Sequence, residues 1–214
     1  MNKASVADLR INYVTNELLE KNVFNDPVRQ FEIWFKDAKD SGIREPNAMV
    51  LSTIEDNKPS SRVVLLKGFD SEGFVFYTNY LSDKGIQMAE TPFVSLNFFW
   101  DILERQVRVE GTVEKVSEKD SDEYYWSRPR GSQIGAWVSN QSSVVETREV
   151  LQEKLDYFEA KFKDMEVIPR PPHWGGYLVR PEKIEFWQGR PNRLHDRLLF
   201  SHDGAAWKIE RLSP

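Results

Sequence analysis

Between residues 48 and 117 the chain repeats one pattern, in which short runs of β-forming residues alternate with turn residues. Closely spaced runs of this kind are typical of antiparallel strands joined by tight turns, and they favour a meander that closes into a barrel. In the last run, Val107, Val109, Gly111 and Val113 fall on one face because side chains alternate along a strand. The runs are AMVLSTI, SRVVLLKGF, GFVFYTN, FVSLNFFW and RQVRVEGTVEKVS.

Helical signals lie outside and between these runs. In the stretch 26–42, Asp26 is the expected N-cap, Pro27 takes the first helical position and Gly42 marks the end. Further helices are expected over SDKGIQMAE, over SEKDSDEYYWSR and over SVVETREVLQEKLDYFEAKF, the last beginning with a capping box of Ser143 and Glu146. The segments YLVRPEKIEFWQG and RLHDRLLF to AAWKIERL read as strands. The expected class is mostly β with peripheral helices.

The composition argues against several functional classes of protein. The chain has 214 residues, a net charge of −5 and no cysteine. It is long enough for one domain over 1–214, and it has neither a run of about 20 apolar residues nor a secretory signal. We therefore expect a cytoplasmic protein with no membrane span. The acidic balance argues against nucleic-acid binding, and the three histidines are not spaced as ligands, so no metal site is expected.

The stretch FWQGRPNRLHDRLLF carries Arg193, His195 and Arg197 at every second position. On a strand, these three basic side chains would share one face. Together with Trp187 upstream, they would suit a flat, anionic, heteroaromatic ligand. The competing interpretation is an exposed edge strand whose charges prevent aggregation, and the residues alone leave both open.

One other segment suggests phosphate binding. YYWSRPRGSQIGAWVSNQSS combines arginines with hydroxyl and amide donors, which match phosphate oxygens, although a solvated loop is also compatible with it. In a different segment, the apolar run Val63–Leu66 is expected to be buried on both faces. From this segment alone, the preferred interpretation of Arg62 and Lys67 is that they end a core strand at solvent. The polar residues of the first segment are Ser127, Arg128, Arg130, Ser132, Gln141 and Ser142.

These motifs resemble the pyridoxamine/pyridoxine 5′-phosphate oxidase family, from LRINY near the N-terminus to WKIERLSP at the C-terminus. The resemblance implies an antiparallel FMN-binding split β-barrel that works as a homodimer, with FMN at the subunit interface. It also implies a mobile N-terminal segment over 1–25 and C-terminal strands over 170–214 that complete the site. The matching motifs are RVVLLKGFD, FYTNYLSDK, LERQVRVEG, SRPRGSQIGAWVSNQSS, WGGYLVRP, EFWQG and NRLHDR.

The resemblance further implies the reaction and its residues. The enzyme would oxidise pyridoxamine or pyridoxine 5′-phosphate to pyridoxal 5′-phosphate, with oxygen as the acceptor and hydrogen peroxide as a product. Some of the FMN-binding residues are expected from the partner subunit. The implied FMN set is Arg62, Val63, Val64, Leu65, Leu66, Lys67, Tyr77, Thr78, Lys84, Gln106, Gln141, Ser142, Trp187 and Arg197. The implied substrate set is Arg10, Tyr13, Lys67, Tyr124, Arg128, Ser132, Arg193 and His195.

Within this set, Arg193 is the first candidate for catalysis, and His195 is either a proton acceptor or a residue that orients the substrate. Asp83 departs from the resemblance, because the position before Lys84 is usually basic in the family. We therefore expect weaker FMN binding than in a typical member. The alternatives are another FMN-dependent split-barrel oxidoreductase and a non-catalytic flavin or B6-phosphate binder. The preferred substrate is not set by the sequence.

Overall fold

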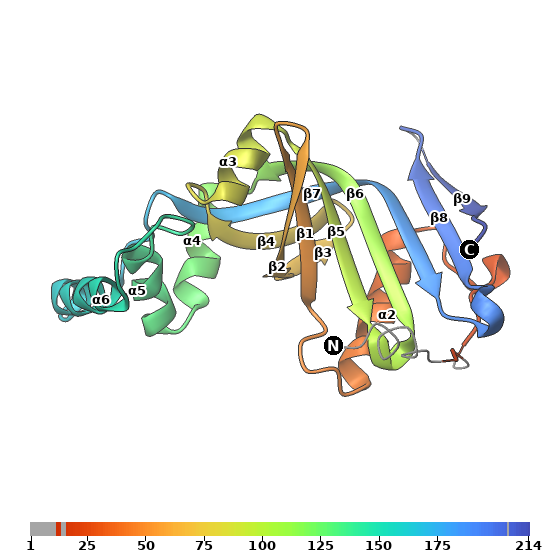
Figure 1. Cartoon of the computed structure of the whole chain (residues 1–214), viewed down its shortest axis with the longest axis horizontal. Coiled ribbons are helices and arrows are strands. Elements are labelled where there is room, and N and C mark those ends of the chain that lie inside the picture. The colour runs from red at the N-terminus through yellow and green to blue at the C-terminus, as the bar shows by residue number, and fades with distance from the viewer. Residues whose placement is uncertain (1–11, 14–15, 205) are drawn as a thin grey trace, which may run out of the picture. The chain divides into compact units, whose positions relative to one another are not determined.

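The computed structural model describes residues 12–13, 16–204 and 206–214. Its strands form one sheet in the order β2-β1-β5-β6-β7-β4-β3, with β8 paired to β7 and β9 paired to β8 (Figure 1). The strands are β1 (Ala48–Glu55), β2 (Lys58–Leu65), β3 (Gly68–Asp70), β4 (Gly73–Asn79), β5 (Phe93–Trp100), β6 (Arg105–Lys115), β7 (Trp174–Gln188), β8 (Asp196–His202) and β9 (Trp207–Arg211). The α-helices are α2 (Pro27–Asp40), α3 (Asp83–Glu90), α4 (Glu118–Ser127), α5 (Arg130–Val138) and α6 (Arg148–Phe162), and the 3₁₀ turns are η1 (Glu20–Asn22), η2 (Asp101–Leu103) and η3 (Pro191–Arg193). The expectation of a mostly β chain with peripheral helices is confirmed.

The chain divides into two compact units, which we describe separately. Unit 1 consists of residues 1–49, 96–110 and 181–214, and unit 2 of residues 50–95 and 111–180. Strands β1, β5, β6 and β7 contribute residues to both.

Unit 1 is built around α2. Asp26 caps this helix as expected, since its carboxylate accepts a hydrogen bond from the Val28 N–H at 2.9 Å. The apolar stripe of α2 packs on the sheet: the ring centroids of Phe31 and Phe98 are 5.1 Å apart, and those of Trp34 and Phe186 are 5.2 Å apart. Because side chains alternate along strands, the residues between these core positions lie on the opposite face of the sheet.

Unit 2 holds the remaining α-helices. In Figure 1, α4, α5 and α6 lie together beside the start of β7. Their buried side chains, together with Ile168 and Trp174, form a second apolar core. This core consists of Tyr125, Ile134, Ala136, Val138, Phe162, Ile168 and Trp174.

Turn chemistry explains the first hairpin. Asp56 and Asn57 connect β1 to β2 with positive φ values of 49° and 61°. Two residues with positive φ are what a two-residue type I′ turn requires, and Asp and Asn tolerate this conformation better than most residues. The turn expected between the first two runs is therefore confirmed.

Several expectations about local structure are wrong. The run Val63–Leu66 is not buried on both faces, because β2 lies at the edge of the sheet and the Val63 side chain is 64% exposed. The segment YYWSRPRGSQIGAWVSNQSS, with which a solvated loop was compatible, instead contains the helix α5. The expected capping box at Ser143 is not used, since α6 begins at Arg148 with Thr147 as its N-cap.

The interpretation that Arg193, His195 and Arg197 alternate along one strand is also wrong. Strand β8 begins only at Asp196, and Arg193 ends the 3₁₀ turn η3. Arg193 and Asn192 both have positive φ, 62° and 57°. Residues 193 and 195 therefore precede the strand, and period-two alternation does not apply to them.

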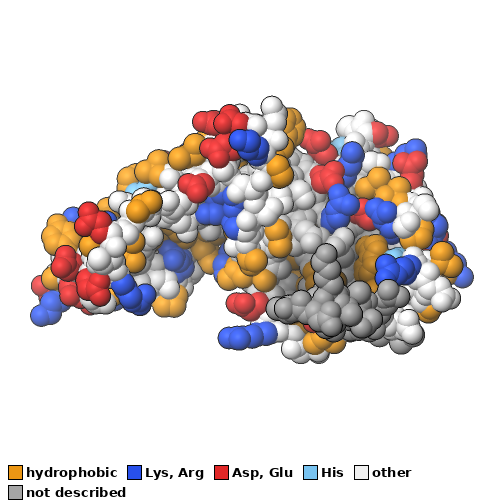
Figure 2. Space-filling view, in the orientation of Figure 1, with side chains coloured by type: hydrophobic (Ala, Val, Ile, Leu, Met, Phe, Trp, Pro, Cys, Tyr) orange, Lys and Arg blue, Asp and Glu red, His pale blue; other side chains and the backbone are white. Residues whose placement is uncertain are grey.

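On the surface that Figure 2 shows, basic side chains of the described residues are interspersed with acidic ones. None of the helices in the described part of the chain is both long and apolar enough to span a bilayer.

Candidate functional site

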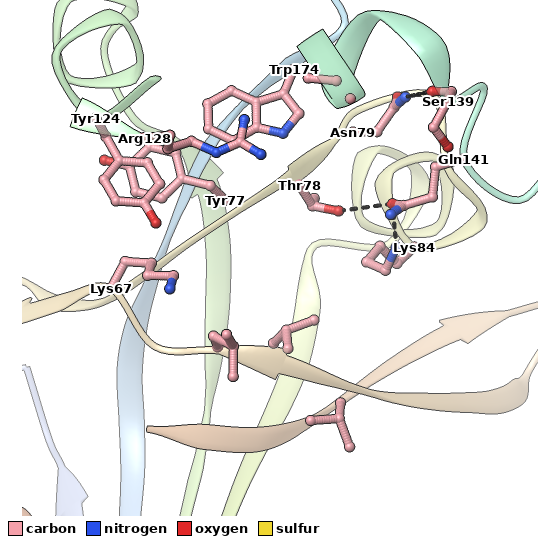
Figure 3. Close-up of a pocket in the computed structure, with 15 residues that line it drawn as sticks. Lys67, Tyr77, Thr78, Asn79, Lys84, Tyr124, Arg128, Ser139, Gln141 and Trp174 are labelled. Carbon is pink, nitrogen blue, oxygen red and sulfur yellow. Dashed lines mark hydrogen bonds between the residues drawn. The ribbon is translucent and has the colours of Figure 1, made fainter. Parts of the chain in front are cut away.

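A pocket of about 430 Å³ lies in unit 2, a volume in the range of small-molecule and cofactor sites. It is lined by the end of β2, by Lys67 two residues beyond it, and by β4 and α3. The remaining lining residues come from α4, α5 and the residues that follow each of them, and from the start of β7 (Figure 3). The lining residues are Val63, Val64, Leu65, Lys67, Tyr77, Thr78, Asn79, Lys84, Tyr124, Arg128, Gly135, Ala136, Ser139, Gln141 and Trp174.

One side of this pocket is organised around Lys84 at the start of α3. Its ammonium group donates to Gln141 Oε1 at 2.8 Å, and that oxygen also accepts from the Thr78 hydroxyl at 3.1 Å (Figure 3). Lys84 is buried, so desolvation lowers the pKa of its ammonium group, and the charge of Arg62 lowers it further. A bound anion would offset this cost, because opposite charge favours the protonated form.

The other side of the pocket is aromatic and cationic. Tyr77 stacks on Tyr124 with ring centroids 3.9 Å apart, and Trp174 continues the stack 5.5 Å from Tyr77. The Arg128 guanidinium lies 4.5 Å over the Trp174 ring. Gly176 permits this packing, since a Cβ there would lie 2.8 Å from the Tyr77 ring.

Arg128 is the most informative member of the pocket. Its Nη1 atom is buried and has no hydrogen-bond partner. Burial lowers the pKa of its guanidinium, and a buried donor of this kind costs free energy unless a ligand satisfies it. Arg128 therefore supplies the pocket with a charged donor group that suits an anion.

A second cluster, in unit 1, surrounds His195. The His195 ring lies 4.7 Å from the Trp187 ring and 5.7 Å from the Tyr13 ring, measured between centroids. Tyr13 approaches closely because position 189 is glycine, where a Cβ would lie 2.7 Å from the Tyr13 ring. This cluster brings together residues that are far apart in the sequence.

The tautomer of His195 follows from its contacts. The Arg190 N–H donates to His195 Nδ1 at 3.1 Å, so that nitrogen acts as the acceptor and the neutral ring carries its proton on Nε2. Burial, together with the charge of Arg193, lowers the pKa of this imidazole. At neutral pH His195 therefore offers an N–H donor rather than a proton acceptor.

Arg197 lies on the sheet face that carries Trp187, because these two residues are directly paired between β8 and β7. Its Nε donates to Glu185 at 2.7 Å, and Glu185 also accepts from Arg108 at 3.2 Å. Gln106 falls on the same face of β6 as Arg108, two residues away. One face of unit 1 thus carries Gln106, Trp187 and Arg197.

The residues of the implied FMN and substrate sets are distributed as follows. Val63, Val64, Leu65, Lys67, Tyr77, Thr78, Lys84, Tyr124, Arg128 and Gln141 line the unit 2 pocket. Tyr13, Gln106, Trp187, Arg193, His195 and Arg197 belong to unit 1. Arg10 lies outside the described residues.

Four unit 2 residues of these sets are not among those that line the pocket. Arg62 donates instead to Thr53 at 2.6 Å and to Gln87 at 3.1 Å. Leu66 is buried, and Ser132 is exposed on the first turn of α5. The Ser142 hydroxyl accepts from the Asp83 N–H at 3.2 Å, which places Ser142 next to the start of α3. Their roles toward a ligand stay predictions.

Sequence reasoning missed Trp174 and Glu185 as site residues. Trp174 precedes two glycines, and such a pair is a usable signal for close packing against aromatic rings. Glu185 gives no comparable signal, since a single glutamate in a strand is ordinary.

Comparisons with known proteins place these observations in a family. A family profile described as "Pyridoxamine 5'-phosphate oxidase" matches residues 35–162, and one described as "Pyridoxine 5'-phosphate oxidase C-terminal dimerisation region" matches residues 174–214. A pyridoxine/pyridoxamine 5'-phosphate oxidase from Gloeothece citriformis (strain PCC 7424) is 58% identical over 212 residues, which cover 98% of this chain and 99% of the relative.

Solved structures agree on the fold. PhzG from Burkholderia lata 383, in complex with tetrahydrophenazine-1-carboxylic acid, aligns with a TM-score of 0.87 at 28% identity, covering 94% of this chain and 99% of that one. A pyridoxamine 5'-phosphate oxidase-related, FMN-binding protein from Nostoc punctiforme PCC 73102 aligns with a TM-score of 0.70 at 16% identity, covering 88% and 98%. The fold is the split barrel that the motifs implied, and the chain belongs to the pyridoxine/pyridoxamine 5'-phosphate oxidase family.

Proposed function

We propose that this chain is an FMN-dependent oxidase that converts pyridoxamine 5′-phosphate and pyridoxine 5′-phosphate to pyridoxal 5′-phosphate. The amine substrate reacts with oxygen and water to give the aldehyde, ammonia and hydrogen peroxide, and the alcohol substrate reacts with oxygen to give the aldehyde and hydrogen peroxide. The observation that carries this proposal is 58% identity to a pyridoxine/pyridoxamine 5'-phosphate oxidase over nearly the full length of both chains. The 28% identity to the phenazine-bound PhzG favours that function less.

The residues of the pocket suit FMN and a phosphorylated pyridine. Both ligands join a flat ring system to a phosphate, so they require aromatic or apolar walls and cationic donors. The unit 2 pocket supplies Lys84 on one side and the Arg128 guanidinium on the other as cationic donors for an anion. We infer that Lys84, Thr78 and Gln141 hold FMN, and that Lys67, Tyr124 and Arg128 hold the substrate phosphate.

Bound FMN would accept a hydride equivalent from the exocyclic carbon of the substrate and pass the electrons to oxygen. The chain itself binds and orients the reactants. Arg128 and Lys67 fix the phosphate end of the substrate, which restricts the pyridine ring to a productive orientation.

Arg193 and His195 are proposed to act at the ring end of the substrate. The Arg193 guanidinium would hold the substrate ring and would stabilise the negative charge that passes to the flavin as the carbon–hydrogen bond breaks. His195 donates through Nε2, because its Nδ1 is already an acceptor for the Arg190 N–H. This arrangement favours orientation of the substrate over proton abstraction as the role of His195.

A homodimer is part of this proposal. Residues 174–214 match a C-terminal dimerisation region, which supports a dimer. We propose that each FMN takes residues from both subunits, and that Trp187 and Arg197 are among the residues the partner supplies.

The purified protein is expected to be yellow and to bleach when pyridoxamine 5′-phosphate is added without oxygen. Flavin absorbance under anaerobic conditions measures this directly, and admitting air should restore the colour with formation of hydrogen peroxide. A yellow protein that stays oxidised with both B6 phosphates would exclude the proposed substrates, while a colourless protein that gains no flavin from added FMN would exclude the cofactor.

The Asp83→Arg variant is expected to bind FMN about threefold to tenfold more tightly than the wild type. Asp83 is exposed at the first position of α3, and its negative charge acts on both Lys84 and Arg62. Replacing it by a cation adds attraction for an anionic ligand at the same helix end. Titration of the apoprotein with FMN, followed by fluorescence quenching, gives the affinity; an unchanged or weaker affinity would show that Asp83 does not limit FMN binding.

A further inference from the structure

Glu185 is a carboxylate buried beneath two arginines. Its side chain is only 8% exposed. One carboxylate oxygen accepts from Arg197 Nε at 2.7 Å, and the other accepts from Arg108 Nη1 at 3.2 Å. A buried carboxylate is costly unless such partners surround it, so both hydrogen bonds are required to keep Glu185 in place.

The Glu185 carboxylate is not part of the apolar core of unit 1. On β7 the neighbouring residues Ile184 and Phe186 are fully buried, and Phe186 packs against Trp34 of α2. Glu185 falls on the opposite face, which it shares with Trp187 two residues later. That face carries the residues of unit 1 that we assign to FMN.

Arg197 is held at two of its three guanidinium nitrogens. Nε donates to Glu185, and Nη1 donates to the Ser213 carbonyl oxygen at 2.9 Å. Within the described part of the chain, no hydrogen bond is formed by Nη2. A planar guanidinium fixed at two corners directs the third in one direction. The hydrogen bond that Arg197 donates to Glu185 raises the pKa of Arg197, which keeps it charged.

We propose that Glu185 is a positioning residue that orients Arg197 so that its remaining N–H groups bind FMN. This inference rests on the proposed function, because it takes Arg197 as an FMN contact. Glu185 itself does not touch the cofactor. Glu185 affects FMN affinity only by orienting the Arg197 guanidinium.

A double-mutant cycle tests this dependence with apoprotein and FMN alone. Glu185→Gln keeps the shape and one acceptor oxygen but removes the charge, and it is expected to weaken FMN binding about tenfold. Arg197→Ala is expected to weaken it at least as much. In the Arg197→Ala background, adding Glu185→Gln should change the affinity less than twofold, since the residue through which Glu185 acts is gone.

Glu110→Gln is the matched control. Glu110 accepts from the same Arg108 at 2.6 Å but has no contact with Arg197, and its side chain is 42% exposed. The Glu110→Gln variant removes the same charge from the same sheet face but leaves the hydrogen bond between Arg197 and Glu185 intact. FMN affinity should therefore stay within twofold of the wild type. A tenfold loss in this control would mean that general electrostatics, not the orientation of Arg197, sets the affinity, and would overturn the proposal.

The other outcomes are equally decisive. Unchanged or tighter FMN binding by Glu185→Gln overturns the proposal, and so does a full tenfold loss that persists in the Arg197→Ala background. If Arg197→Ala binds FMN normally while the wild type still bleaches with pyridoxamine 5′-phosphate, this inference fails and the proposed function stands. Should Glu185→Gln not fold, as judged by circular dichroism, Glu185→Asp, which keeps the charge but shortens the reach, takes its place in the same cycle with the same criteria.

Discussion

Replacing Arg193 by alanine is expected to lower kcat for pyridoxamine 5′-phosphate oxidation about 100-fold or more, while FMN stays bound. Removing one preorganised donor from a developing charge typically costs a factor of this size. The backbone supports a functional reason for this residue: Arg193 and Asn192 both hold positive φ, which costs free energy for residues other than glycine. Steady-state kinetics with a flavin spectrum of each preparation measures both effects.

Two further variants test whether the loss of turnover is specific to the Arg193 guanidinium. Arg193→Lys keeps the charge but loses the planar fork, so it should recover part of the lost rate. Arg148→Ala removes an exposed arginine at the start of α6 and should leave kcat unchanged. Near-normal turnover by Arg193→Ala would remove Arg193 from the reaction.

Replacing Arg128 by methionine is expected to raise KM for pyridoxamine 5′-phosphate about 100-fold. The loss of two charge-assisted hydrogen bonds to phosphate, worth about 2.8 kcal/mol together, accounts for this factor. The effect should be confined to the phosphate, so kcat/KM for unphosphorylated pyridoxamine should stay within twofold of the wild-type value. Kinetics with the two substrates side by side makes this comparison.

The stability of the apoprotein provides an independent check on Arg128. Its buried Nη1 has no partner, so replacing the side chain with an apolar one should not lower the melting temperature of the apoprotein. Arg130→Met is the matched control, because Arg130 donates to the carbonyl oxygens of Phe162 and Met165 instead of lining the pocket. It should leave KM within twofold; equal changes in KM for both variants would argue against a specific phosphate contact at Arg128.

Local signals were sufficient where neighbours in sequence control the structure. The Asp26 cap, the Pro27 start and the period-two runs depend on residues only a few positions apart, and the helix and strands they predicted are present. The helix expected over SEKDSDEYYWSR is also present as α4, where the Ser117 hydroxyl accepts from the Asp120 N–H at 3.0 Å. These features need no knowledge of the tertiary structure.

Local signals failed where distant strands decide the outcome. The apolar run Val63–Leu66 resembles a buried central strand, but pairing order puts β2 at the edge of the sheet. The alternation from Arg193 to Arg197 resembles a strand, but Arg193 has positive φ and ends a 3₁₀ turn. Burial and backbone conformation at these positions depend on partners that sequence spacing does not reveal.

By itself, the sequence determined the mostly β class, the family resemblance and the set of residues to consider for FMN and substrate. Only the tertiary structure decided which of them share the pocket with Lys84 and Arg128, that Nδ1 of His195 is an acceptor, and that Glu185 holds Arg197. The physical reason is that hydrogen bonds and desolvation act between atoms a few ångströms apart, whereas the chain brings those atoms together from positions as distant as Thr78 and Gln141.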